Sequence, residues 1–196
     1  RTFSTPTTGS EGGPPEQGRR DVRDTHILAI ALVGVALSAV AGETTCAEAM
    51  QEVAASHDDD PIVLAIAAES LMNLQPWDYW EADRTTPKGR TDEIVAHLEK
   101  ALEIDPDNAA AIHFYIHAVE ASATPERAEP YADALRGQAP ALGHLVHMPA
   151  HIYMRFGRHG DLIAVNREAA AADEMLLEQM GEAAAPIYRY GYYPHN

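Results

Sequence analysis

The chain has 196 residues, 46% of them apolar, and a formal net charge of −16 with neutral histidines. This apolar content argues against a wholly disordered protein, and the acidic surface repels phosphate backbones, so nucleic acid is not expected as a partner. The single cysteine, Cys46, excludes an internal disulfide and is expected to be a small packing residue. Abundant alanine and few β-branched runs favour helices.

The N-terminal part divides into a tail and an apolar run. Residues 1–24 are rich in Gly, Pro, Ser and Thr and predict a flexible tail. The following run, Ile27–Ala41, would extend about 22 Å as a helix, which is too short to cross a membrane of roughly 30 Å. We interpret it as the first helix of the fold.

A secretory signal peptide is the alternative for this region. Arginines at positions 19, 20 and 23 precede the apolar run, and residues 39–41 fit a small-x-small cleavage site. The sequence therefore does not assign a compartment. The helix interpretation favours the cytoplasm, and a signal at 19–41 would place the protein in the periplasm or outside the cell.

Prolines at regular positions indicate a helical repeat. Pro106 and Pro140 each end a helical pattern and lie 34 residues apart, the length of a tetratricopeptide helix–turn–helix unit. Pro61 ends an earlier unit. The unit between Pro61 and Pro106 is longer, and its extra residues predict an inserted loop at 75–90. The aromatic residues of that loop (Trp77, Tyr79 and Trp80) are expected to pack over a groove edge or a neighbouring helix, or otherwise to contact a ligand.

The histidines form a pattern that the repeat explains. His113 and His117 are four residues apart, and Glu120 follows three residues later. A second group comprises His144, His147 and His151. Spacings of three, four and seven place each group on one face of a helix. Adding 34 converts the first pair into His147 and His151, so equivalent imidazoles on adjacent repeats can converge on one metal ion.

These features strongly resemble the tetratricopeptide repeat family over about residues 27–174. The resemblance implies an all-α, right-handed solenoid of about four helix pairs spanning 25–174, with its first helices lining a concave groove. It also implies that the histidines and Glu120 face that groove. More narrowly, HFYIHAVE, GHLVHMPAHIY and YYPHN resemble a bacterial subgroup of the family. The Tyr-rich segment 175–196 is expected to be a truncated further repeat, in which His195 folds back toward the other histidines.

Together these residues predict a transition-metal site. A set of ligands rich in imidazole suits Zn, Cu or Fe better than Mg or Ca. Glu120 would be a further ligand or the catalytic general base of a metal-dependent hydrolase or oxidase. The expected ligands are His113, His117, Glu120, His144, His147, His151 and His195. Pro149 interrupts the second histidine-bearing helix and should kink it.

The sequence is also compatible with two other functions. The groove could bind a peptide or protein without metal, as repeat proteins commonly do, with the histidines supplying hydrogen bonds. Alternatively, the chain could be a structural subunit that assembles with copies of itself through the aromatic loop and its C-terminal end. Neither of these functions requires a metal ion.

Overall fold

The computed structural model describes residues 43–181, 186 and 188–196; the predicted tail, the apolar run and the signal-peptide alternative lie outside them. The described chain is helical, which confirms the all-α prediction, and its one β-type pairing is an isolated bridge between Trp80 and Pro87. The elements are α2 (Glu43–Ser56), α3 (Pro61–Met72), α4 (Thr91–Ile104), α5 (Ala109–Val119), η1 (Pro125–Ala128), α6 (Glu129–Leu135), α7 (Gly143–His147), α8 (Pro149–Arg155), α9 (His159–Met180), η3 (Tyr188–Tyr192) and α10 (Tyr193–His195).

Prolines and capping side chains set the ends of the helices near the site. The Asp60 carboxylate accepts two backbone N–H groups in the first turn of α3, where Pro61 occupies the first position. Asn108 caps α5 in the same way by accepting the N–H of Ala111. The repeat boundary predicted near Pro106 therefore lies between α4 and α5, and it fixes where α5 begins.

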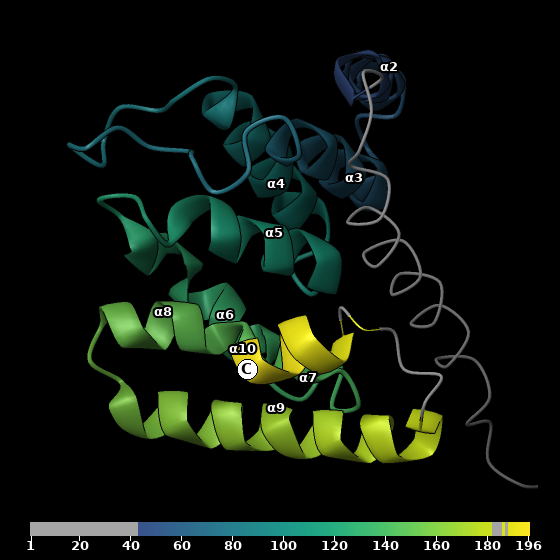
Figure 1. Ribbon diagram of the computed structural model, residues 1–196. Helices are drawn as coiled ribbons and strands as arrows, with labels where there is room; N and C mark the ends of the chain where they lie inside the picture. Colours follow the sequence, from purple (N-terminus) through teal and green to yellow (C-terminus); the bar gives the residue numbers. More distant parts are fainter. Residues whose placement is uncertain (1–42, 182–185, 187) are drawn as a thin grey trace, which may run out of the picture.

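Successive helices pack on one another in chain order, as Figure 1 shows. Helix α5 lies in the middle, in contact with α3 and α4 on one side and with α6 and α8 on the other, and α9 covers α7 and α8. Leu98, Ile112 and Ile152 are fully buried between these layers. Burying a side chain of this size stabilises the fold by roughly 1.5–3 kcal/mol. The tetratricopeptide-type solenoid itself stays a prediction.

The second histidine-bearing helix is divided at the predicted proline. Helix α7 ends at His147, α8 begins at Pro149, and Met148 lies between them. Proline has no N–H with which to continue the helical hydrogen bonds, so the ladder is interrupted there. The N–H of Met148 still bonds to the carbonyl of His144, and the backbone stays in the right-handed region. The histidines on the two short helices are therefore held close to one another across the break.

One expectation from the sequence was wrong. Cys46 is exposed on α2 and does not pack in the core. Helix α9 runs past residue 174, where the repeat domain was predicted to end, and stops at Met180, before Gly181 with its positive φ. None of the helices in the described part of the chain is long and apolar enough to cross a membrane.

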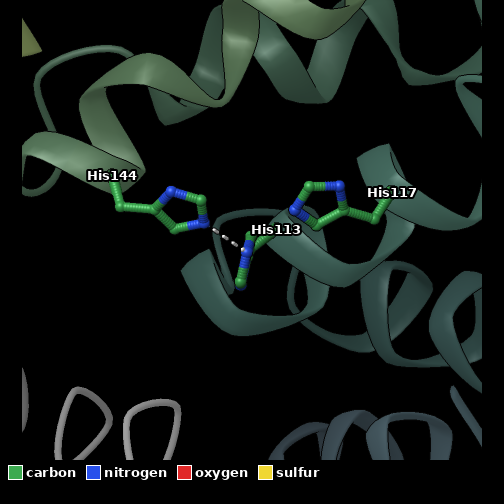
Figure 2. Close-up of side chains that lie close together, drawn as sticks. All are labelled: His113, His117 and His144. Carbon is green, nitrogen blue, oxygen red and sulfur yellow. Dashed lines mark hydrogen bonds between the residues drawn. The ribbon is translucent and has the colours of Figure 1, made fainter. Parts of the chain in front are cut away.

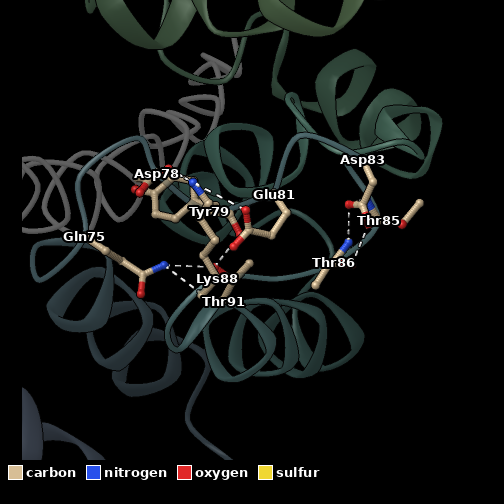
Figure 3. A network of polar contacts seen from close by, with 9 residues as sticks. All are labelled: Gln75, Asp78, Tyr79, Glu81, Asp83, Thr85, Thr86, Lys88 and Thr91. Atoms are coloured by element: carbon tan, nitrogen blue, oxygen red, sulfur yellow. Dashed lines mark hydrogen bonds and ion pairs between the residues drawn. The ribbon is translucent and has the colours of Figure 1, made fainter.

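The inserted loop between α3 and α4 is held by a network of polar contacts (Figure 3). The amide of Gln75 donates to the carbonyl of Lys88 and to the Thr91 hydroxyl. The Lys88 ammonium reaches Asp78 at 2.6 Å. Trp80 anchors the loop to the site, because its indole N–H donates to the carbonyl of Ala118 on α5 at 2.7 Å. The loop therefore lies along the helix that carries the first histidine pair.

Candidate metal centre

The first group of histidines comes from α5 and α7. His113 and His117 are one helical turn apart on α5, and their ring centroids are 5.0 Å apart. His144 approaches them from α7, and its Nε2 lies 3.2 Å from the Nε2 of His113. Figure 2 shows the three rings pointing toward one another from the two helices. Each ring offers a nitrogen, and the three nitrogens lie within 4.8 Å of one another. We call these three residues the first triad.

A second group of three comes from α7, α8 and the C-terminal segment. His147 and His151 lie on either side of the Pro149 break, and their Nε2 atoms are 3.1 Å apart. His195 on α10 completes the group, and its ring centroid is 4.7 Å from that of His147. Nitrogens of these three residues also lie within 4.8 Å of one another. We call them the second triad.

Glu120 joins the two triads. Its carboxylate accepts the Nδ1–H of His151 at 2.9 Å and lies 3.4 Å from Nδ1 of His117. Burial raises the pKa of Glu120, but the hydrogen bonds from His117 and His151 lower it more, to about 2. The group is therefore a carboxylate at neutral pH and can only accept hydrogen bonds. One side chain thus orients one imidazole of each triad.

The outer hydrogen bonds of the second triad determine which nitrogens face inward. The Oδ1 of Asn166 lies 2.7 Å from Nδ1 of His147 and can only accept, so that Nδ1 carries the proton. Nδ1 of His151 carries one for the same reason, because it faces the Glu120 carboxylate. The Nε2 lone pairs of His147 and His151 then face each other at 3.1 Å. A cation between them, either a proton or a metal ion, would stabilise such an approach.

The geometry favours a metal ion over a proton. Two nitrogens bound to one ion at roughly 2.0–2.1 Å lie about 2.8–3.4 Å apart at angles from 90° to tetrahedral. The two short contacts, 3.2 Å in the first triad and 3.1 Å in the second, fall in this range. A shared proton serves two nitrogens, whereas three converge in each triad.

Burial favours the neutral form of five of the imidazoles, which is the form that binds metal. Removal from water lowers the pKa of His144 to about 3 and that of His147 to about 4. The same cause lowers the pKa of His117 and His195, and it holds the pKa of His113 well below its usual value. Packed imidazoles would repel one another if protonated. Their lone pairs are therefore available at neutral pH.

The first triad carries unsatisfied polar atoms that the second does not. Nδ1 of His113 and Nδ1 of His144 are buried and have no hydrogen-bond partner among the described residues. A neutral imidazole has one N–H, so the 3.2 Å contact between these rings leaves at least one buried N–H unpaired in the metal-free protein. Leaving such a group unpaired costs about 1–3 kcal/mol. A metal ion bound by these rings would offset part of this cost, so the first triad could hold one.

The aromatic residues that surround the cluster divide into two sets. Tyr192 lies against His144 with ring centroids 4.9 Å apart, and Trp77 contacts His117 edge-on at the same separation. Tyr115 and Tyr153 instead point away, because their hydroxyl groups donate to Glu99 and Asp133. Trp77 therefore contacts the cluster itself, while Trp80 anchors the same loop to α5.

Sequence reasoning missed two residues that support the second triad. Asn166 on α9 orients His147. Asp173, also on α9 and fully buried, accepts hydrogen bonds from Tyr188 and from Asn196, and so holds the C-terminal segment that carries His195. Asp173 also lies so close to Gly143 that a methyl group there would be 2.0 Å from its Oδ1. No spacing rule predicts contacts between α9 and residues so distant in the sequence.

All seven side chains predicted as ligands lie in this cluster, but they do so as three overlapping groups rather than as one set.

No protein-family model matches the chain, and no curated protein matches it. The function is therefore inferred from the geometry of the cluster.

Proposed function

We propose that this protein is a tetratricopeptide-type helical repeat protein whose histidine cluster binds a transition metal. The Nε2 atoms of His147 and His151, which face each other 3.1 Å apart, are the observation that carries the proposal. Neutral imidazole donors suit Zn, Cu or Fe, and they suit Mg or Ca poorly. Helices packed in chain order and the 34-residue spacing of the histidine pairs support the repeat assignment.

The site supports metal-dependent catalysis. Three protein ligands leave at least one coordination position on a four-coordinate ion, as in catalytic zinc sites, where the ion activates a bound water molecule or polarises a substrate. Glu120 is then a positioning residue, because its carboxylate is engaged by His117 and His151. A carboxyl group with a pKa of about 2 is also a weak general base at neutral pH. The protein would be a metal-dependent hydrolase or oxidase.

Elemental analysis of the full chain, purified without a histidine tag, tests the proposal. The protein is stripped with a chelator, reconstituted separately with Zn²⁺, Cu²⁺ and Fe²⁺, and dialysed. At least one equivalent of one metal is expected to remain. The paired substitution His147→Ala with His151→Ala should release it. The matched control changes His57 and His159 to Ala, since both are exposed and lie outside the cluster.

Two results would overturn the proposal. One is less than about 0.2 equivalents of each metal after reconstitution. The other is equal metal retention by the cluster variant and the control, with circular dichroism showing that both are folded. A groove that binds peptides without metal predicts this outcome, together with peptide binding that a chelator does not change.

A further inference from the structure

We propose that the cluster holds two metal ions side by side, one in each histidine triad, and that Glu120 links the two sites from outside. This inference rests on the metal-binding function proposed above and extends it. The sequence suggested one ion shared between equivalent histidines of adjacent repeats. The structure instead divides the six histidines into two sets of three with no member in common.

Each triad has the same composition. A pair of histidines four residues apart supplies two nitrogens, and a histidine from a different element supplies the third. His144 joins the pair on α5, and His195 joins the pair on α7 and α8. Both short nitrogen–nitrogen contacts lie within a triad. Each triad is thus a complete three-imidazole site by itself.

A single ion cannot use all six imidazoles in this arrangement. Nitrogens on opposite sides of one ion lie about 4.2 Å apart, so six ligands would all have to lie within that distance of one another. Among the described residues, no group larger than three is brought within 4.8 Å. Two ions are required if both triads are to bind.

The triads are nevertheless adjacent. The rings of His117 and His151 have centroids 5.1 Å apart, and those of His144 and His195 are 5.7 Å apart. Paired metal ions in enzymes lie roughly 3.5–4 Å apart and act on one substrate atom or on two neighbouring ones. Rings this close allow two ions at comparable separation. The chemical class of ligand that fits between two such ions is a small oxygen donor, such as hydroxide or dioxygen.

Glu120 lies on the outer side of this pair. It contacts the Nδ1 atoms of His117 and His151, which leaves the Nε2 atom of each ring for its own triad. Partners of this kind orient ligating imidazoles and raise their basicity. A third group, formed by His117, Glu120 and His151, also lies within ligand distance. A metal ion bound in this third group would replace the hydrogen bonds between the Glu120 carboxylate and the Nδ1 atoms of His117 and His151. A single ion in this group is therefore the alternative to a pair of ions in the two triads.

Metal stoichiometry and affinity in single variants test the inference. The stripped full chain is titrated with Zn²⁺ and with Cu²⁺ against a chromophoric chelator. Wild-type protein should bind two equivalents. His195→Ala changes an exposed residue near the chain end and should weaken one equivalent at least about tenfold while leaving the other unchanged. His144→Gln should weaken the other equivalent, and His57→Ala should retain both.

The outcomes separate this inference from the proposed function. Two equivalents that respond separately to the two variants support the pair of sites. One equivalent in wild-type protein, lost in either variant, overturns the pair and leaves a single metal site. Binding of no metal overturns both proposals. If His144→Gln does not fold, His113→Asn takes its place in the same triad.

A second measurement asks whether the two sites are adjacent. Neighbouring copper(II) ions couple magnetically, so the integrated electron paramagnetic resonance signal of wild-type protein with two copper(II) ions should fall well below its copper content. In His195→Ala loaded with one equivalent, the signal should account for all of the copper. A full signal from wild-type protein at two equivalents would place the ions too far apart and would overturn the paired centre.

Discussion

The two histidine triads use the same ligands but are built differently. The first takes all its members from helices inside the stack, α5 and α7, and the Nδ1 atoms of His113 and His144 have no partner in the described chain. The second takes His195 from an exposed position near the chain end. Its other two rings are held by Asn166 and Glu120. Packing thus shapes the first triad, whereas hydrogen bonds and a docked segment shape the second.

This difference indicates how each site would respond to change. The first triad should keep all three of its ligands when the C-terminal segment is lost, although Tyr192 of that segment contacts His144. It should be sensitive to acid, because its rings are the more deeply buried. The second should depend on contacts made by α9, because α9 both orients His147 and fastens the segment that carries His195.

The largest predicted effect is a fall in the free energy of unfolding when the metal-free protein is acidified. The pKa of His144 in the folded protein is about 3, and that of His147 is about 4, whereas an unfolded histidine titrates near about 6.5. Below that pH these histidines take up protons in the unfolded chain but stay neutral in the folded chain. The free energy of unfolding therefore falls as the pH drops from about 6.5 toward the pKa values of the folded protein. For His147 alone the loss is on the order of 3 kcal/mol by pH 4.

Urea denaturation in the presence of a chelator, from pH 7 to pH 4.5, measures this loss. His144→Gln and His147→Gln should each flatten the pH dependence by a similar amount, since both folded pKa values lie below the measured range. The exposed His57 provides the control, and His57→Gln should leave the slope unchanged. Parallel pH curves for wild type and both cluster variants would show that these two histidines do not cause the loss of stability in acid.

The next effect, on metal affinity, is expected at Glu120. A glutamine side chain has one acceptor oxygen, so Glu120→Gln can orient only one of the two imidazoles that the carboxylate holds. Loss of such an outer partner typically weakens metal binding 10–100-fold, and both equivalents should be affected because Glu120 contacts both triads. Asn166→Ala should weaken only the second equivalent, since Asn166 contacts His147 alone among the ligands.

Competition with a chromophoric chelator measures both affinities in each variant. Glu103→Gln, an exposed carboxylate away from the cluster, is the matched control and should change neither. Equal weakening of both equivalents by Asn166→Ala would mean that the triads are not separate sites.

Helical periodicity was sufficient to predict that most of the proposed ligands lie close together. His113 and His117 are neighbours on α5 because a helix places residues four apart on one face, and the 34-residue offset predicted that His147 and His151 would face them. The inserted loop followed from an excess of length between two prolines. These inferences succeed because they depend on local geometry or on a repeated unit.

The division into triads could not be read from the sequence. It depends on how imidazoles rotate about their side-chain bonds, which Glu120 and Asn166 determine through contacts between different helices. The place of His195 depends on Asp173, which is distant in the sequence and has no motif around it. The prediction for Cys46 failed for a related reason: the burial of one residue depends on what covers its helix, not on its own type.

A smaller and more selective effect is expected from the contacts that fasten the C-terminal segment. Asp173 accepts hydrogen bonds from Tyr188 and from Asn196, the latter at 2.6 Å. Asp173→Asn keeps the size of the side chain but replaces one acceptor oxygen with a donor, so at least one of these bonds should be lost. The second equivalent of metal should then bind about tenfold more weakly while the first is unchanged.

Metal titration of two further variants checks the cause. Asn196→Ala removes one of these bonds and should affect the second site in the same direction. Tyr193→Phe removes another bond between the segment and α9, at the exposed Glu174, and should weaken the second site less than Asn196→Ala does while leaving the first unchanged. Weakening of the first equivalent by Asn196→Ala would contradict the claim that only the second triad depends on the segment.

The smallest effect is optical and is expected at Trp77. This residue is 71% exposed, and its ring centroid lies 4.9 Å from that of His117, a member of the first triad. The only other tryptophan, Trp80, is bonded to the carbonyl of Ala118, and no histidine among the described residues makes a ring contact with it. Copper(II) bound in the first triad should therefore quench the emission of Trp77, with little change in affinity when that ring is replaced.

Fluorescence titration with copper(II) assigns this signal to one triad. Trp77→Phe should remove the quenchable part of the emission while both equivalents still bind within about threefold of wild type, because the tryptophan contacts the rim of the cluster and donates to no ligand. His144→Gln should reduce the quenching more than His195→Ala does, because Trp77 contacts a ring of the first triad. A larger reduction in His195→Ala would mean that the loop reports on the second triad and that the ligands are divided differently from the two sets described above.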